Sequence, residues 1–173
     1  MNERDKPIVG LTGKDEKTDE KSSSTKQRLH LLAHGQLYGV LCTQANDQPY
    51  GSMVAFAFSP DLSSFVFSTP IATRKYRLLT ECPNVALVVN NQVDCPGDLM
   101  RIEAFTATGK ASEIPRETEF SEPAQLLLTR HPQLQSFLDT PTTALFEVSI
   151  ARFYLVDSFQ KVRQWAPSEN RED

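Results

Sequence analysis

The stretch FSTPIATRKYRLLTECPNV, residues 67–85, places a short helix between two strands. Thr69 or Thr73 can cap the start of this helix with its hydroxyl oxygen, and Pro70 suits a helix start. The helix is expected to end near Cys82, because Pro83 follows and the residue before a proline disfavours helical backbone. The stretch therefore predicts a strand, a capped helix and a second strand in direct succession.

The charges along this helix run in the opposite order to the usual one. Its front half carries three cations, which are Arg74, Lys75 and Arg77, and its only acid is Glu81 at the back. A helix N-terminus is electropositive and favours acids or bound anions, and phosphate is a common anion there. One interpretation is a solvated cationic face paired with the acids of residues 113–122. The other is an anion site, with further hydroxyl donors from Ser68, Thr69 and Thr73.

The rest of the chain is predicted to be mainly β with inserted helices. Strands are expected at residues 37–44, 49–59, 64–69, 84–91, 99–114 and 143–158. Val54, Phe56 and Phe58 should face one way, and Met53, Ala55 and Ala57 the other. Helices are expected at residues 25–35, where Gly35 can end the helix, and 117–130, with a shorter turn after Pro132. Six mostly antiparallel strands favour a closed or nearly closed barrel over a doubly wound sheet.

Composition limits the cellular context and the partners. We expect a flexible tail at residues 1–24, a single domain at 25–165 and a polar tail at 166–173. The net charge of −4 argues against bulk nucleic-acid binding, and no apolar run is long enough to span a membrane. Three cysteines without a CxxC pair, and no signal peptide, indicate a cytoplasmic protein without a disulfide framework.

Three motifs in order resemble one known family. They are Phe67-Ser68-Thr69 followed by Thr73-Arg74-Lys75 and Cys82-Pro83-Asn84-Val85, the paired strands VLCTQANDQPYGSMVAFAF, and the strand FTATGKASEI. This order over residues 27–156 resembles the FMN-binding split-barrel superfamily, whose best-known member is pyridoxamine 5'-phosphate oxidase. The resemblance implies a six-stranded antiparallel split β-barrel that binds FMN.

The resemblance also implies where the flavin would bind. Arg74 and Lys75 would hold the FMN phosphate, and the ring would lie against residues 51–55. Its edge would bond backbone groups of Ser52, Met53 and Val54. Members are usually homodimers with flavins at the interface, so Trp165 could cap a flavin of the partner protomer or simply pack the C-terminal segment. The apolar dimer surface could come from aromatic residues that could equally be core, namely Phe105, Phe146, Phe153 and Tyr154.

The chain also departs from the oxidase. Ser52 and Ala57 stand where the oxidase carries an Arg and a Lys, and no Arg-x-His signature follows Ser158. The sequence therefore predicts an FMN-dependent oxidoreductase with another small-molecule substrate or electron donor, and identifies no catalytic residue. The alternatives are a haem-binding protein, with His30, His34 or the tail supplying an axial ligand, and a non-catalytic flavin-binding module. His30 and His34 stand at i, i+4 without a third ligand, so we expect no metal site.

Overall fold

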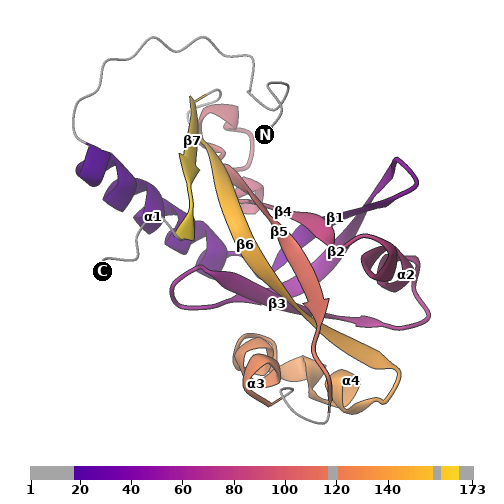
Figure 1. The fold of residues 1–173 in the computed structure, drawn as a ribbon. Coiled ribbons are helices and arrows are strands. Elements are labelled where there is room, and N and C mark those ends of the chain that lie inside the picture. The colour runs from indigo at the N-terminus through magenta and orange to yellow at the C-terminus, as the bar shows by residue number, and fades with distance from the viewer. Residues whose placement is uncertain (1–17, 117–120, 158–160, 168–173) are drawn as a thin grey trace.

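Six antiparallel strands close into a barrel, as the sequence predicted, in a computed structural model that describes residues 18–116, 121–157 and 161–167 (Figure 1). The sheet order is β3-β2-β1-β4-β5-β6-β7, and pairing of β3 with β6 closes the barrel. The strands are β1 (Tyr38–Ala45), β2 (Gln48–Phe58), β3 (Ser64–Pro70), β4 (Asn84–Asn90), β5 (Ala104–Glu113), β6 (Thr143–Asp157) and β7 (Lys161–Trp165).

The long strand β6 pairs with two different strands along one edge. Its first half, Thr143–Ser149, pairs with β3, and its last part, Phe153–Asp157, pairs with β7. Strand β5 occupies the opposite edge. Strand β7 was not predicted from the sequence, because its five residues include two cations and a glutamine and lack a strand-like apolar pattern. Pairing with β6 stabilises this segment as a strand although its sequence lacks the apolar alternation.

Alternation along β2 follows the prediction. Val54, Phe56 and Phe58 are buried in the barrel, whereas the Met53 side chain is 64% exposed. The interior is aromatic, and its largest fully buried side chains are Phe56, Phe58, Phe65, Phe67, Phe105 and Phe153. Phe105, Phe146 and Phe153 are thus ordinary core, which was one of the two roles considered for them.

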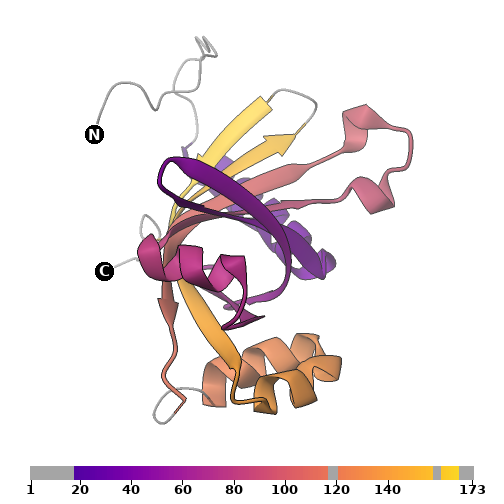
Figure 2. The same ribbon diagram turned by 90° about the vertical axis from the view of Figure 1, so that its right-hand side faces the viewer.

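Helices close the barrel and cover its outside (Figure 2). Leu29, Leu32 and Ala33 of α1 (Thr18–Gly35) pack into the barrel core, and Leu79 of α2 (Arg74–Glu81) joins the same core. The helices α3 (Ser121–Arg130) and α4 (Gln135–Asp139) pack against outward-facing residues of β2, β3 and β6. None of the helices in the described ranges combines the length and hydropathy needed to cross a bilayer.

Two predicted boundaries were wrong. Helix α1 begins at Thr18 and not at residue 25, and residues 18–24 lack the apolar spacing that would have indicated the earlier start. The strand predicted at 99–114 begins only at Ala104, and two short 3₁₀ turns precede it, η2 (Gln92–Asp94) and η3 (Leu99–Arg101). There the Asp98 carboxylate accepts a bond from the Met100 backbone N–H at 3.1 Å, which favours a turn over a strand.

Candidate functional site

Helix α2 begins with a side-chain cap, and Thr73 is the capping residue. Its hydroxyl oxygen accepts a bond from the Tyr76 backbone N–H at 3.2 Å, and its hydroxyl donates to the Pro70 carbonyl at 2.8 Å. The Thr69 hydroxyl lies 3.1 Å from that of Thr73 and is buried. Because the Thr73 proton is directed to Pro70, Thr69 is the donor of this pair. Both hydroxyls therefore hold the turn together. Of the three predicted hydroxyl donors, only Ser68 forms no side-chain hydrogen bond with another described residue.

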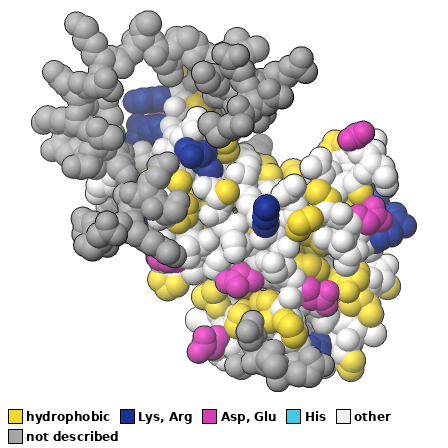
Figure 3. All heavy atoms as spheres, in the orientation of Figure 1, with side chains coloured by type: hydrophobic (Ala, Val, Ile, Leu, Met, Phe, Trp, Pro, Cys, Tyr) yellow, Lys and Arg dark blue, Asp and Glu magenta, His cyan; other side chains and the backbone are white. Residues whose placement is uncertain are grey.

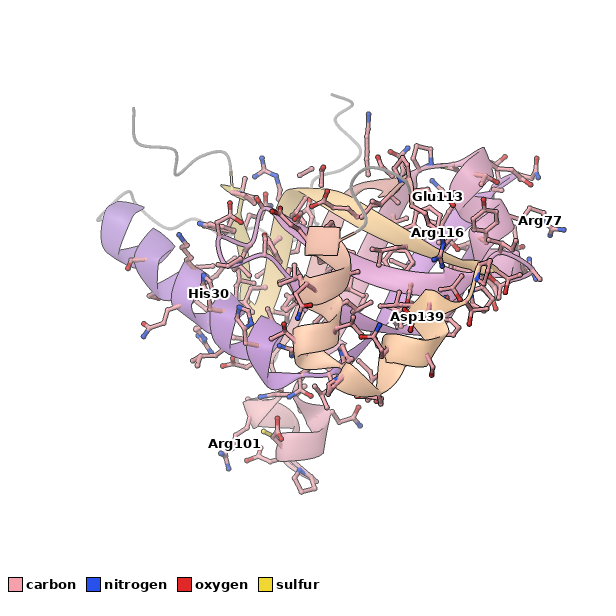
Figure 4. All side chains as sticks on the ribbon, turned by 90° about the horizontal axis from the view of Figure 1, so that it is seen from below. His30, Arg77, Arg101, Glu113, Arg116 and Asp139 are labelled. Atoms are coloured by element: carbon pink, nitrogen blue, oxygen red, sulfur yellow. The ribbon has the colours of Figure 1, made fainter. Side chains whose placement is uncertain are left out.

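The three cations of α2 lie in different surroundings. The exposed Arg74 guanidinium lies 4.8 Å from the Tyr50 ring centroid, and the half-buried Lys75 ammonium lies 5.9 Å from the Phe67 centroid. Burial lowers the pKa of Lys75. Arg77 instead pairs with Glu81 at 3.9 Å and extends outward (Figure 4).

Arg74 and Lys75 form no ion pair within the described part of the chain. Glu113, the first acid of the 113–122 segment, accepts a bond from the Tyr76 hydroxyl at 2.9 Å and not from a cation. The backbone N–H groups of Arg74 and Lys75 belong to the first turn of α2, where a helix offers no intrahelical acceptor. No acid stands in that turn. Two cations and two N–H groups thus meet at one helix end, as an anion site requires.

The backbone of β2 next to this helix has an open edge. The β2–β3 ladder contains only the pairs Phe56–Phe67, Ala57–Val66 and Phe58–Phe65. Residues 51–55 pair with β1 on one side and have no ladder partner within the described ranges on the other. Strand β3 runs from Phe67 towards the turn that starts α2. The N–H and C=O groups on the open edge of β2 are therefore available to a ligand.

The side chains of the three predicted β2 residues lie in three different environments. Met53 points outward, and Val54 lies in the core. The Ser52 hydroxyl is buried and has no hydrogen-bond partner among the described residues. A buried hydroxyl without a partner is costly, so a bound polar group beside Ser52 would be favourable.

Trp165 does not come together with the α2 cradle, which we define as Arg74, Lys75 and the open edge of residues 51–55. The indole is 4% exposed, packs 5.6 Å from the Phe153 ring centroid and lies under Lys26 of α1. Its strand β7 and α1 lie on the opposite side of the molecule from α2 (Figure 1). Within one protomer Trp165 packs the C-terminal segment, and a role towards a partner's flavin stays a prediction.

His30 and His34 lie away from the cradle, whereas His131 contacts β2 at Phe56, the residue that follows the open edge. His30 and His34 stack with ring centroids 5.5 Å apart on α1, far from Arg77 (Figure 4), and burial lowers the pKa of both. His131 had no partner visible in the sequence. It is buried, and its Nε2 lies 3.0 Å from the Phe56 carbonyl oxygen. Within the described ranges, no three His, Cys, Asp or Glu side chains are grouped as metal ligands.

Ala57 shows how the chain departs from an oxidase site. It is 2% exposed and packs with Val66, Ala124 and Leu127 in the apolar cluster beneath α3. A lysine there would place an ammonium among aliphatic side chains, which is strongly unfavourable without a partner. The apolar surroundings of Ala57 therefore agree with the absence of a lysine at this position.

A polar hollow of about 440 Å³ adjoins the turn before α2. Ile71, Glu113 and Arg116 are among its lining residues, and the Ile71 backbone N–H binds the Thr142 carbonyl at 2.9 Å. The Arg116 guanidinium donates to the carbonyls of Leu138 and Thr143, at 2.8 and 2.9 Å. Figure 4 shows Glu113 and Arg116 near each other. Nothing in the sequence pattern identified this hollow, because its lining comes from three segments far apart in the chain.

Basic side chains do not form a continuous surface on the face seen in Figure 3, where they lie in a few separate groups. The cations of the α2 cradle are accordingly a local feature of a chain with net charge −4. A local pair of cations suits a single anionic group.

Comparison with known proteins agrees with this architecture. The family model described as pyridoxamine 5'-phosphate oxidase matches residues 25–157. A search of curated proteins found no significant match. The fold is similar to a heme binding protein from Mycobacterium smegmatis, with a TM-score of 0.73 and 14% identity over 83% of this chain and 58% of that one.

Two further solved structures share the fold. Campylobacter jejuni ChuZ has a TM-score of 0.69 and 12% identity over 87% of this chain and 66% of that one. A FAD-binding protein from Mesorhizobium loti has a TM-score of 0.60 and 13% identity over 75% of this chain and 90% of that one. At these identities the structures show the fold alone, whereas the family model covers most of the sequence. This chain therefore belongs to the pyridoxamine 5'-phosphate oxidase family of split barrels.

Proposed function

We propose that this protein binds FMN at the α2 cradle. Arg74, Lys75 and the first N–H groups of α2 hold the phosphate, and the open edge of β2 at Ser52–Val54 bonds the polar edge of the ring. The observation that carries this proposal is the early end of the β2–β3 ladder at Phe56–Phe67. It leaves a row of backbone donors and acceptors on the side from which β3 leads to α2.

The electrostatics of the cradle support a dianion. Arg74 is exposed and can present two parallel N–H donors to phosphate oxygens, whereas Lys75 acts as a point charge. The partly buried Lys75 ammonium lacks an acidic partner in the described structure, so a phosphate would offset its desolvation. A FAD-binding protein with the same fold is consistent with a flavin ligand.

We further propose that the protein is an FMN-dependent oxidoreductase of the cytoplasm. Bound FMN would supply hydride or electron transfer, and the chain would bind and orient it. Because the sequence after Ser158 has no Arg-x-His signature, the substrate is not held as the oxidase holds its phosphorylated pyridoxamine. A reduced nicotinamide or a quinone-like molecule fits a site without dedicated acid–base residues. No residue is assigned a catalytic role.

The outer face of the sheet supports a homodimer with flavin at the interface. Met53, Val40 and Val88 stand opposite one another across β2, β1 and β4, and Tyr38 is the next outward residue on β1. Met53, Tyr38 and Val40 are exposed. A contiguous exposed apolar patch of this kind marks an interaction surface. Sedimentation of the wild type and of Val40→Glu would test it: a dimer that becomes a monomer supports the proposal, and an unchanged species rejects this face.

The absorbance spectrum of the purified protein, before and after FMN is added and dialysed away, tests the cofactor. We expect two flavin bands that remain. A Soret band would show that the protein binds haem, and would reject FMN as its cofactor. A flavin that no nicotinamide or dithiol donor reduces would favour a non-catalytic flavin-binding module.

The variant Arg74→Ala/Lys75→Ala tests the site. Loss of two charged hydrogen-bond partners should weaken FMN binding by about 100-fold or more. Arg77→Ala is the matched control, because Arg77 pairs with Glu81 and extends away. Equal loss in the control, or unchanged affinity in the double variant, would reject the α2 cradle.

A further inference from the structure

A hollow of about 460 Å³ lies where β1 and β4 separate. The β1–β4 ladder contains three pairs and ends at Cys42–Ala86. Beyond that pair β1 continues only with β2, and β4 only with β5. The tip of the β1–β2 hairpin extends away from the rest of the sheet there (Figure 1). Two strand edges without a ladder partner in the described structure thus line the hollow.

A β-bulge forms another side of the hollow. The β5–β6 register shifts at Thr108/Gly109, which leaves Ala151 without a partner in the ladder. A Cβ atom on Gly109 would lie 2.3 Å from the Ser149 carbonyl oxygen, so only glycine fits this position. Gly109 and Ala151 both line the hollow. Bulges that redirect a strand are common beside functional sites, so the opening is part of the fold and not an accident of side-chain packing.

The lining combines small side chains with polar ones. The small side chains are those of Cys42, Ala86 and Ala151. The polar ones include the amides of Gln44 and Asn84 and the ammonium of Lys110. The volume lies within the range of small-molecule sites, roughly 300–1,000 Å³. The hollow shares no residue with the α2 cradle.

We propose that this hollow is a second ligand site, for a flat conjugated molecule that carries one anionic group. A sheet with small side chains offers a flat apolar floor, which suits an aromatic ring system. Lys110 is exposed and forms no ion pair among the described residues, so it can meet a carboxylate or sulfonate. The two amides can both donate and accept bonds at the ring edge. The inference does not depend on FMN binding at the cradle.

Titration of the full-length protein with 8-anilinonaphthalene-1-sulfonate, a conjugated aromatic sulfonate that fluoresces when shielded from water, tests the site. We expect saturable binding of one dye per protomer. Ala86→Phe should abolish it by filling the hollow, and Ala151→Leu should weaken it from the opposite wall. Lys110→Gln should weaken it about threefold to fivefold, as expected for an exposed ion pair.

Matched controls are available on β7. Val162→Phe introduces the same side chain as Ala86→Phe at a half-buried strand position away from the hollow, and Lys161→Gln repeats the Lys→Gln change at an exposed one. Dye binding should be unchanged in both. The proposal would be overturned if the wild type did not bind the dye. It would also be overturned if Ala86→Phe and Ala151→Leu, shown by circular dichroism to be folded, bound the dye as tightly as the wild type.

The two sites can be told apart. Arg74→Ala/Lys75→Ala should lose FMN yet keep the dye, and Lys110→Gln should keep FMN at wild-type affinity. Displacement of the dye by FMN would overturn the proposal of a second site, because the flavin itself would then occupy the hollow.

Discussion

Arg28 of α1 forms an ion pair with Asp157 of β6, 129 residues further along the chain. Arg28 also pairs with Glu103, just ahead of β5, and Arg163 of β7 reaches the same Asp157 carboxylate at 3.0 Å. The hydrogen bond with Glu103 raises the pKa of Arg28. This network joins the helix that closes one end of the barrel to three segments of the sheet.

Asp157→Asn should lower the free energy of unfolding by about 3 kcal/mol, because it removes the charge that two partly buried guanidinium groups share. Chemical denaturation measures the change. Glu81→Gln is the control, since the exposed Arg77–Glu81 pair contributes less than about 1 kcal/mol. Equal effects in the two variants would show that the network does not hold α1 to the sheet.

Thr73→Ala should destabilise the protein by about 1 kcal/mol through loss of the α2 cap. It should also weaken FMN binding, because the turn that positions the α2 N–H groups would loosen. Thr73→Ser retains the hydroxyl and should behave like the wild type. Thermal unfolding and FMN titration would check both, and an alanine variant of unchanged stability would argue against the cap.

Arg74→Glu should stabilise the free protein by about 0.3–1 kcal/mol, because an acid in the first turn is favoured by the helix dipole. The same variant should not bind FMN. Stability without ligand and affinity for FMN would thus change in opposite directions. If the ligand-free variant were less stable than the ligand-free wild type, Arg74 would contribute to folding through its contact with Tyr50. That result would contradict a role of Arg74 in anion binding alone.

Lys75 should make stability depend on pH in the alkaline range. Burial lowers its pKa in the folded protein below the ordinary value of 10.5, so the unfolded chain binds more protons between the two values. The unfavourable contribution is complete at neutral pH and disappears as pH rises to 10.5. Lys75→Met should therefore exceed the wild type in stability at pH 7, and the difference should shrink as pH rises. A constant difference would contradict this assignment.

Gly109→Ala should cost about 2–3 kcal/mol, because the new methyl group meets the Ser149 carbonyl and the backbone must shift. Gly35→Ala is the control, since nothing lies within 4 Å of a Cβ atom there, and its effect should stay within about 0.5 kcal/mol. Denaturant titration of both variants makes the comparison. A tolerated Gly109→Ala would show that the bulge adjusts easily.

The sequence by itself determined the six barrel strands, the inward face of β2, the capped helix α2 and the family. These features are encoded by residues close together in the chain, since alternation and capping act over two to four residues. The position of Arg74 and Lys75 at the start of α2 was likewise readable from the local sequence.

Only the tertiary structure decided where the ladders end and which distant groups meet. It showed that β3 and β7 share one edge of β6 and that the edge of β2 is open beside α2. It also showed that, among the described residues, Arg77 forms an ion pair whereas Arg74 and Lys75 do not. It also placed Trp165 in the core. Such features depend on strand pairing and packing between segments far apart in the chain, and local sequence patterns do not specify them.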